Sequence, residues 1–132
     1  MNILYIDDDP EDREIFKEAL SRINPEITLN LAADGGEGFT VLEGLTLVPD
    51  LIFVDVNMPG IGGKQFLNEA KRIPGLKTVP IIMYSTTSHE KEMKELFRLG
   101  ASKVLVKPRS FNKVCELISS VIKSESQISI DF

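Results

Sequence analysis

The sequence alternates short apolar runs with segments of helical spacing, and this alternation constrains the fold more than any other feature. Five runs have the length of a strand, and each is followed by a stretch whose apolar residues recur three and four positions apart. Continuous apolar runs are typical of parallel strands that helices cover on both faces. The sequence therefore predicts an α/β fold, a doubly wound sheet of five parallel strands with helices on both faces. The five runs lie at residues 3–6, 27–31, 51–54, 81–84 and 104–106.

The second apolar run differs from the others, because residues 27–31 alternate apolar and polar side chains. Such alternation is typical of a strand at the edge of a sheet. With the first strand further in, the pattern predicts the flavodoxin-like strand order 2-1-3-4-5. The helical segment after this run contains Gly38, which we expect to weaken that helix by about 1 kcal/mol relative to alanine.

Local signals indicate where helices begin and end. Asp9 followed by Pro10 has the form of an N-cap and a first-turn proline, so a helix should begin there. We therefore interpret Asp9 as a structural residue rather than a metal ligand. Asn24 and Pro25 can end this first helix, and Gly100 can end the fourth helix before the last strand.

Length and composition favour a single domain. With 132 residues, of which 42% are hydrophobic, the chain can bury one substantial core but is too short for two typical domains. We expect this domain over residues 1–124 and a short C-terminal tail over residues 125–132. The net charge of -5 and the lack of a basic run argue against direct binding of nucleic acid. No apolar stretch approaches the roughly 20 residues that span a bilayer, so we expect a soluble, cytoplasmic protein that is not bound to a membrane.

Polar side chains follow four of the predicted strands, at the edge where a doubly wound sheet places its functional loops. Carboxylates gathered at one edge repel one another, and a bound cation relieves that repulsion. Ligands that are all oxygen select a hard ion, and few carboxylates beside a phosphoryl group suit Mg²⁺. An amine can neutralise the remaining negative charge, and a hydroxyl can donate a hydrogen bond. The residues in question are Asp7 and Asp8, Asp55, Ser85 and Thr86, and Lys107.

The whole set resembles the receiver domain of response regulators in two-component systems. The resemblance extends from residue 2 to about residue 123, and its four elements occur in order, each at the end of a predicted strand. They are Asp7-Asp8, Asp55-Val56-Asn57-Met58-Pro59-Gly60, Ser85, and Lys107-Pro108.

The resemblance implies a role for each matching position. Asp55 would be the phosphoacceptor, and Mg²⁺ would be held by Asp55 together with Asp7, Asp8 and the backbone carbonyl of Asn57. Ser85, Thr86 and Lys107 would bind the phosphoryl group and take part in the switch, with Pro108 in a structural role. In this family the Lys-Pro peptide is usually cis, which would direct Lys107 across the site.

The resemblance also implies a signalling protein rather than an enzyme, one that promotes only its own Mg²⁺-dependent phosphorylation and dephosphorylation. Its phosphoryl donor would be a phosphohistidine on a sensor histidine kinase or on a histidine phosphotransfer protein. With no output domain expected, a stand-alone receiver would signal by binding a separate protein target. A homodimer through the faces of the fourth and fifth helices is a further expectation.

Among the positions that depart from the family pattern, Val104 bears most on the output step. Val104 occupies the place where many receiver domains carry Tyr or Phe, whose ring moves inward when the switch hydroxyl moves. The step from phosphorylation to output must therefore take another form in this chain.

The sequence lacks the residues that several other functions would require. An aspartyl-phosphate phosphatase would need a second aspartate at Asn57, and a flavin binder would not place acids such as Asp7 and Asp8 against a phosphate. Residues 35–38 are rich in glycine but lack the lysine of a phosphate-binding loop, and His89 fits a solvated helix start. The alternative that stays open is a receiver-like interaction module that works without phosphorylation.

Overall fold

Five strands alternate with helices through the part of the chain that the structure describes, as the apolar runs predict. A computed structural model describes residues 1–86 and 89–130, and for residues 126–130 it describes the backbone alone. The elements are β1 (Asn2–Ile6), α1 (Pro10–Ile23), β2 (Thr28–Ala32), α2 (Gly35–Gly44), β3 (Leu51–Asp55), α3 (Gly63–Ala70), a 3₁₀ turn η1 (Pro74–Leu76), β4 (Ile81–Ser85), α4 (Glu90–Arg98), β5 (Lys103–Val106) and α5 (Phe111–Ile130).

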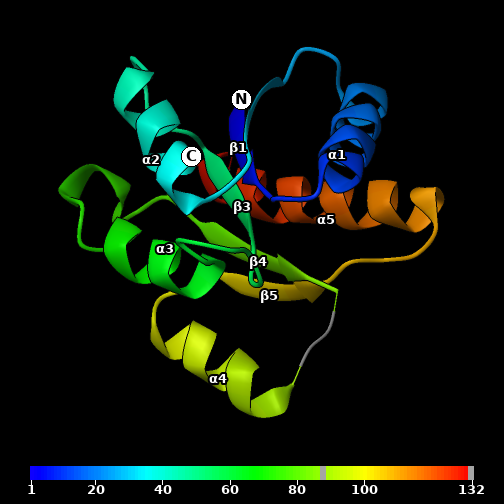
Figure 1. Ribbon diagram of the computed structural model, residues 1–132. Helices are drawn as coiled ribbons and strands as arrows, with labels where there is room; N and C mark the ends of the chain where they lie inside the picture. Colours follow the sequence, from blue (N-terminus) through cyan, green and yellow to red (C-terminus); the bar gives the residue numbers. More distant parts are fainter. Residues whose placement is uncertain (87–88, 131–132) are drawn as a thin grey trace.

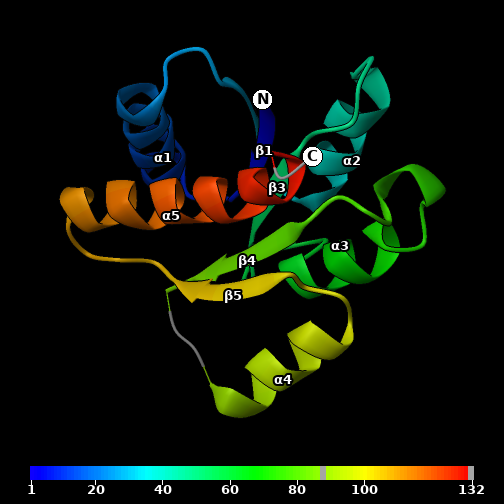
Figure 2. The same ribbon diagram turned by 180° about the vertical axis from the view of Figure 1, so that it is seen from behind.

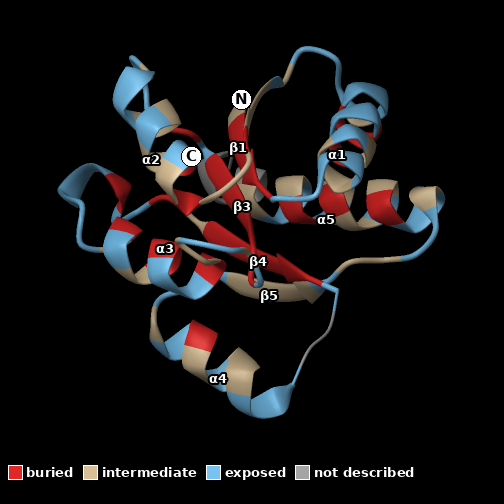
Figure 3. Ribbon diagram, in the orientation of Figure 1, coloured by how far each residue is buried: buried red, intermediate tan, exposed pale blue. Residues whose placement is uncertain are grey.

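The strands form one parallel sheet in the order β2-β1-β3-β4-β5, which confirms the predicted fold and places β2 at an edge. Helices α1 and α5 lie together on one face of this sheet, and α2, α3 and α4 lie on the other (Figures 1 and 2). All five residues of β3 and all five of β4 are buried, as expected for inner strands (Figure 3).

Each face of the sheet buries its own core, because successive side chains of a strand point to opposite faces. On β1, Leu4 and Ile6 join an aliphatic core beneath α2, α3 and α4, whereas Ile3 and Tyr5 join the core beneath α1 and α5. Although Phe66 lies in the first core, the second core holds most of the buried aromatic rings. The rings of Tyr5 and Phe16 stack there with centroids 4.1 Å apart, and Phe53 and Tyr84 meet Phe16 edge-on.

The helix boundaries agree with the local signals. The carboxylate of Asp9 accepts a hydrogen bond from the backbone N–H of Glu11 at 2.9 Å, which confirms the predicted N-cap. Asn24 ends α1, and Gly100 follows α4 with φ at +112°, a conformation that favours glycine. Helix α5 extends to Ile130, so residues 125–130, which we expected in a tail, continue this helix, and residues 131 and 132 lie outside the described residues.

Gly38 is the position where the sequence interpretation misses a packing reason. A Cβ atom at Gly38 would lie 2.5 Å from Cδ1 of Ile6 and 3.2 Å from the ring of Phe66. Glycine therefore lets α2 approach β1 and α3 closely, and its cost to helix formation is offset by that packing.

In the part of the chain that the structure describes, no helix is long and apolar enough to cross a membrane.

Candidate functional site

Three carboxylates meet where β1 and β3 end. One oxygen each of Asp7, Asp8 and Asp55 lies within 4.8 Å of the other two. Asp7 is fully buried and Asp55 nearly so, whereas Asp8 is exposed. Oxygen ligands with one side open to solvent fit a hard divalent cation that keeps part of its water shell, which is the chemistry of Mg²⁺.

The carboxylate of Asp7 is held from both sides. Its Oδ1 accepts a hydrogen bond from the backbone N–H of Asp9 at 2.9 Å. Its Oδ2 accepts one from the ammonium of Lys107 at 2.6 Å and another from the hydroxyl of Tyr5. The guanidinium of Arg13 donates a hydrogen bond to the backbone carbonyl of Asp7 at 2.8 Å. These donors keep a fully buried carboxylate satisfied and fixed in orientation.

Lys107 brings a positive charge into the carboxylate cluster from the loop after β5. Its Nζ lies 2.6 Å from Oδ2 of Asp7, 2.9 Å from Oδ2 of Asp12 and 3.8 Å from Oδ1 of Asp55. The Lys107–Pro108 peptide is trans, like every other peptide bond of the described residues. The cis form implied by the resemblance is therefore wrong for this structure, in which Lys107 points to Asp7 and Asp12 from a trans peptide.

Asp55 is an acid in an environment that disfavours its charge. Burial at the end of β3 raises its pKa to about 7, and the neighbouring charges of Asp7 and Asp8 act in the same direction. Lys107 and a hydrogen bond from the backbone of Asn57 act in the opposite direction and lower this pKa. A cation bound here would stabilise the ionised carboxylate, which is the nucleophilic form.

Comparison with known proteins identifies the family. The model of the response regulator receiver domain matches residues 3–119. The chain belongs to this family. The nitrate/nitrite response regulator NarL of Escherichia coli K12 is 35% identical over 108 residues, which are 80% of this chain and 47% of NarL. The chain spans 16 to 65% of the length of four such curated relatives.

Solved structures share the receiver fold. The chemotaxis response regulator CheY4 of Vibrio cholerae is 27% identical, with a TM-score of 0.78 over 91% of this chain and 97% of that one. The Mn²⁺-bound form of response regulator Rcp1 is 24% identical, with a TM-score of 0.80 over 91% of this chain and 90% of that one. Receiver domains are signalling domains that interact with sensor histidine kinases and bind Mg²⁺ in an acidic pocket.

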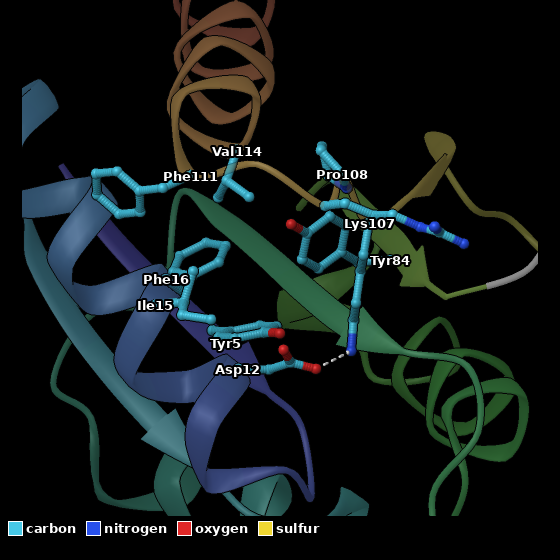
Figure 4. A pocket seen from close by; sticks show the side chains of 10 residues that line it. Tyr5, Asp12, Ile15, Phe16, Tyr84, Lys107, Pro108, Phe111 and Val114 are labelled. Carbon is cyan, nitrogen blue, oxygen red and sulfur yellow. Dashed lines mark hydrogen bonds and ion pairs between the residues drawn. The ribbon is translucent and has the colours of Figure 1, made fainter.

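The other receiver positions that the sequence predicts lie in or shortly after β3, β4 and β5. Ser85 is buried at the end of β4, and Thr86 is exposed directly after it. Asn57 is exposed in the loop after β3. Val104 pairs with Met83 in the sheet and packs against the aliphatic core. Pro108 lines a cavity of about 160 Å³ between α1 and the start of α5 (Figure 4).

Sequence interpretation missed two residues of this receiver site, Tyr5 and Asp12. Tyr5 lies within an apolar run and was assigned to the core, which is true of its ring, but its hydroxyl reaches Asp7. Asp12 lies in the first turn of the helix predicted to begin at Asp9 and Pro10, where the helix dipole favours an acid and gives it a structural explanation. The available signal for Tyr5 was its place two residues before an acid that directly follows the strand, because side chains at i and i+2 of an extended chain share one face.

Proposed function

We propose that Asp55 accepts a phosphoryl group from a phosphohistidine donor in a Mg²⁺-dependent reaction and that this modification switches a partner-binding surface. The observation that carries the proposal is the gathering of Asp7, Asp8 and Asp55 at one sheet edge, with the ammonium of Lys107 3.8 Å from Asp55. This combination offers a carboxylate nucleophile, oxygen ligands for a cation and a positive charge for phosphoryl oxygens.

In the proposed reaction an oxygen of Asp55 attacks phosphorus in line with the leaving nitrogen of the donor histidine. The bond from oxygen to phosphorus forms while the bond from phosphorus to nitrogen breaks, and the product is an acyl phosphate on Asp55. Asp7, Asp8, Asp55 and the backbone carbonyl of Asn57 would hold the cation. When bound, Mg²⁺ supplies positive charge that neutralises the transferring oxygens.

The remaining chain residues have supporting roles in the proposal. Lys107 neutralises one phosphoryl oxygen, and Ser85 with Thr86 binds another at the end of β4. The Mn²⁺ named for Rcp1 supports a divalent cation in this fold. We infer that the chain promotes only its own phosphorylation and dephosphorylation and acts on other proteins by binding them. A histidine kinase or phosphotransfer protein as donor, a homodimer through α4 and α5, and a cytoplasmic location stay predictions.

The test uses acetyl phosphate, a small acyl-phosphate donor, with Mg²⁺ and intact mass measurement. Wild type is expected to gain one phosphoryl group, and Asp55→Asn to gain none, because an amide is not a nucleophile for phosphorus. Asp9→Asn is the matched control, since Asp9 follows β1 directly after Asp7 and Asp8 but its carboxylate caps α1. Omitting Mg²⁺ should suppress the gain in wild type.

Two results would contradict the proposal. Wild type without added mass would favour an interaction module that works without phosphorylation. Equal added mass on wild type and Asp55→Asn would place the phosphoacceptor elsewhere in the chain.

A further inference from the structure

We propose that Asp12 is a positioning residue that competes with the phosphoacceptor site for Lys107 and thereby slows modification of Asp55. This inference rests on the proposed function and assigns a regulator of that same site. Asp12 lies in the first turn of α1, outside the carboxylate cluster of Asp7, Asp8 and Asp55. It is connected to the cluster through Lys107.

The geometry favours Asp12 over Asp55 as a partner of the ammonium. Figure 4 shows the Lys107 side chain extending from the loop after β5 towards Asp12 on α1, across the cavity between α1 and α5. Nζ of Lys107 is 2.9 Å from Oδ2 of Asp12, within hydrogen-bond distance, and 3.8 Å from Oδ1 of Asp55, beyond it. The lysine side chain is only 10% exposed, so water does little to weaken these contacts.

Two carboxylates thus fix Lys107 before any phosphoryl group arrives. The ammonium carries three N–H donors, and Asp7 and Asp12 each accept one of them. Asp7 is fully buried and accepts from other donors as well, whereas the side chain of Asp12 is 28% exposed. Water can therefore replace Lys107 on Asp12 more easily than on Asp7, so the Asp12 contact is the one that can be given up.

A phosphoryl group on Asp55 changes this balance. It brings about two negative charges and several acceptor oxygens to a position closer to Lys107 than the carboxylate alone. To move towards those oxygens, Lys107 must lengthen its hydrogen bond to Asp12. Removing the negative charge of Asp12 should therefore let Lys107 reach the transferring group sooner.

The experiment measures the rate at which acetyl phosphate with Mg²⁺ adds a phosphoryl group, read by intact mass. Asp12→Asn is expected to raise this rate about three-fold, the size of effect that a partly exposed ion pair produces. Asp12→Glu keeps the charge and should stay near the wild-type rate. Glu11→Gln is the matched control, because it removes one negative charge from the same turn of α1, at an exposed side chain next to Asp12.

A double-mutant cycle separates an effect through Lys107 from a structural or general electrostatic one. The gain from Asp12→Asn should disappear in a Lys107→Ala background, because the residue on which Asp12 acts is gone. Three results would overturn the role of Asp12 while leaving Asp55 as phosphoacceptor. They are an unchanged rate in Asp12→Asn, an equal rate increase in Glu11→Gln, and an equal rate increase from Asp12→Asn in the Lys107→Ala background. If that background reacts too slowly to measure, the Glu11→Gln comparison decides. Wild type without added mass would overturn the proposed function, and the role of Asp12 with it.

Discussion

The acidic site should cost the protein stability when no cation is bound, and Asp55→Asn should recover part of that cost. Burial raises the pKa of Asp55 from 3.8 to about 7, so the folded chain holds a proton that the unfolded chain has already released. Stability therefore falls as pH rises from about 4 to about 7 and is level above that. With about 1.4 kcal/mol for each pKa unit, full ionisation destabilises the fold by at most about 4 kcal/mol.

Urea unfolding in the presence of a chelator measures this effect at about pH 5 and about pH 8. Roughly two of the three pKa units are titrated between these conditions, so the stability of Asp55→Asn relative to wild type should increase by about 3 kcal/mol. Added Mg²⁺ should stabilise wild type more than the variant, because the variant has lost one of the carboxylates proposed to hold the cation.

Glu43→Gln serves as the control, since Glu43 is an exposed acid on α2, away from the carboxylate cluster. It should show little change in stability at either pH. A constant difference between Asp55→Asn and wild type across this pH range would refute the reasoning, because it would mean that Asp55 ionises in the folded chain as it does in the unfolded one.

Two further substitutions test how the surrounding fold holds the site. Gly63→Ala would place a Cβ 2.2 Å from the carbonyl oxygen of Asp55, so we expect the free energy of unfolding in urea to fall by about 2–4 kcal/mol. Gly44→Ala is the control, because its Cβ would meet no atom within 4 Å and should not destabilise the fold. Equal stabilities of the two variants would show that the loop after β3 moves aside without cost. Tyr5→Phe removes a hydrogen-bond donor from the fully buried carboxylate of Asp7, so without a cation it should lower the free energy of unfolding by about 1–3 kcal/mol. An unchanged stability would mean that another donor replaces the hydroxyl.

The fold could be predicted because its signals are local and repeated. Each strand is an apolar run, the polar alternation of residues 27–31 indicates an edge, and Asp9 and Gly100 act through the backbone next to them. Gly38 shows where this approach fails. Its packing against Ile6 depends on how close α2 lies to β1, and helix propensity contains no information about that distance.

The candidate site could be predicted to the level of which strand ends meet, because parallel strands bring their carboxyl ends to one edge. Which side chain Lys107 contacts depends on small differences in distance between elements that are far apart in sequence. Its Nζ is 2.9 Å from Oδ2 of Asp12 and 3.8 Å from Oδ1 of Asp55. Asp12 and Lys107 are 95 positions apart, and the dipole of α1 alone gave Asp12 a sufficient explanation. Polar atoms such as the hydroxyl of Tyr5 are hidden from pattern analysis for a similar reason, since the ring satisfies the apolar periodicity.

The two cores bear on how a change at Asp55 would spread through the fold. Val104 packs into the aliphatic core, and its branched side chain has few rotamers with which to respond. Lys107 lies on the other face, with its ammonium 5.6 Å from the ring centroid of Tyr84, whose ring meets Tyr5 edge-on. The rings of Tyr5 and Tyr84 also line the cavity of about 160 Å³ between α1 and α5, so a displacement of Lys107 has space on this side of the sheet. A movement of Lys107 away from Asp12 would therefore act first on α1 and α5, which line the cavity beside it, and only then on the face that contains Val104.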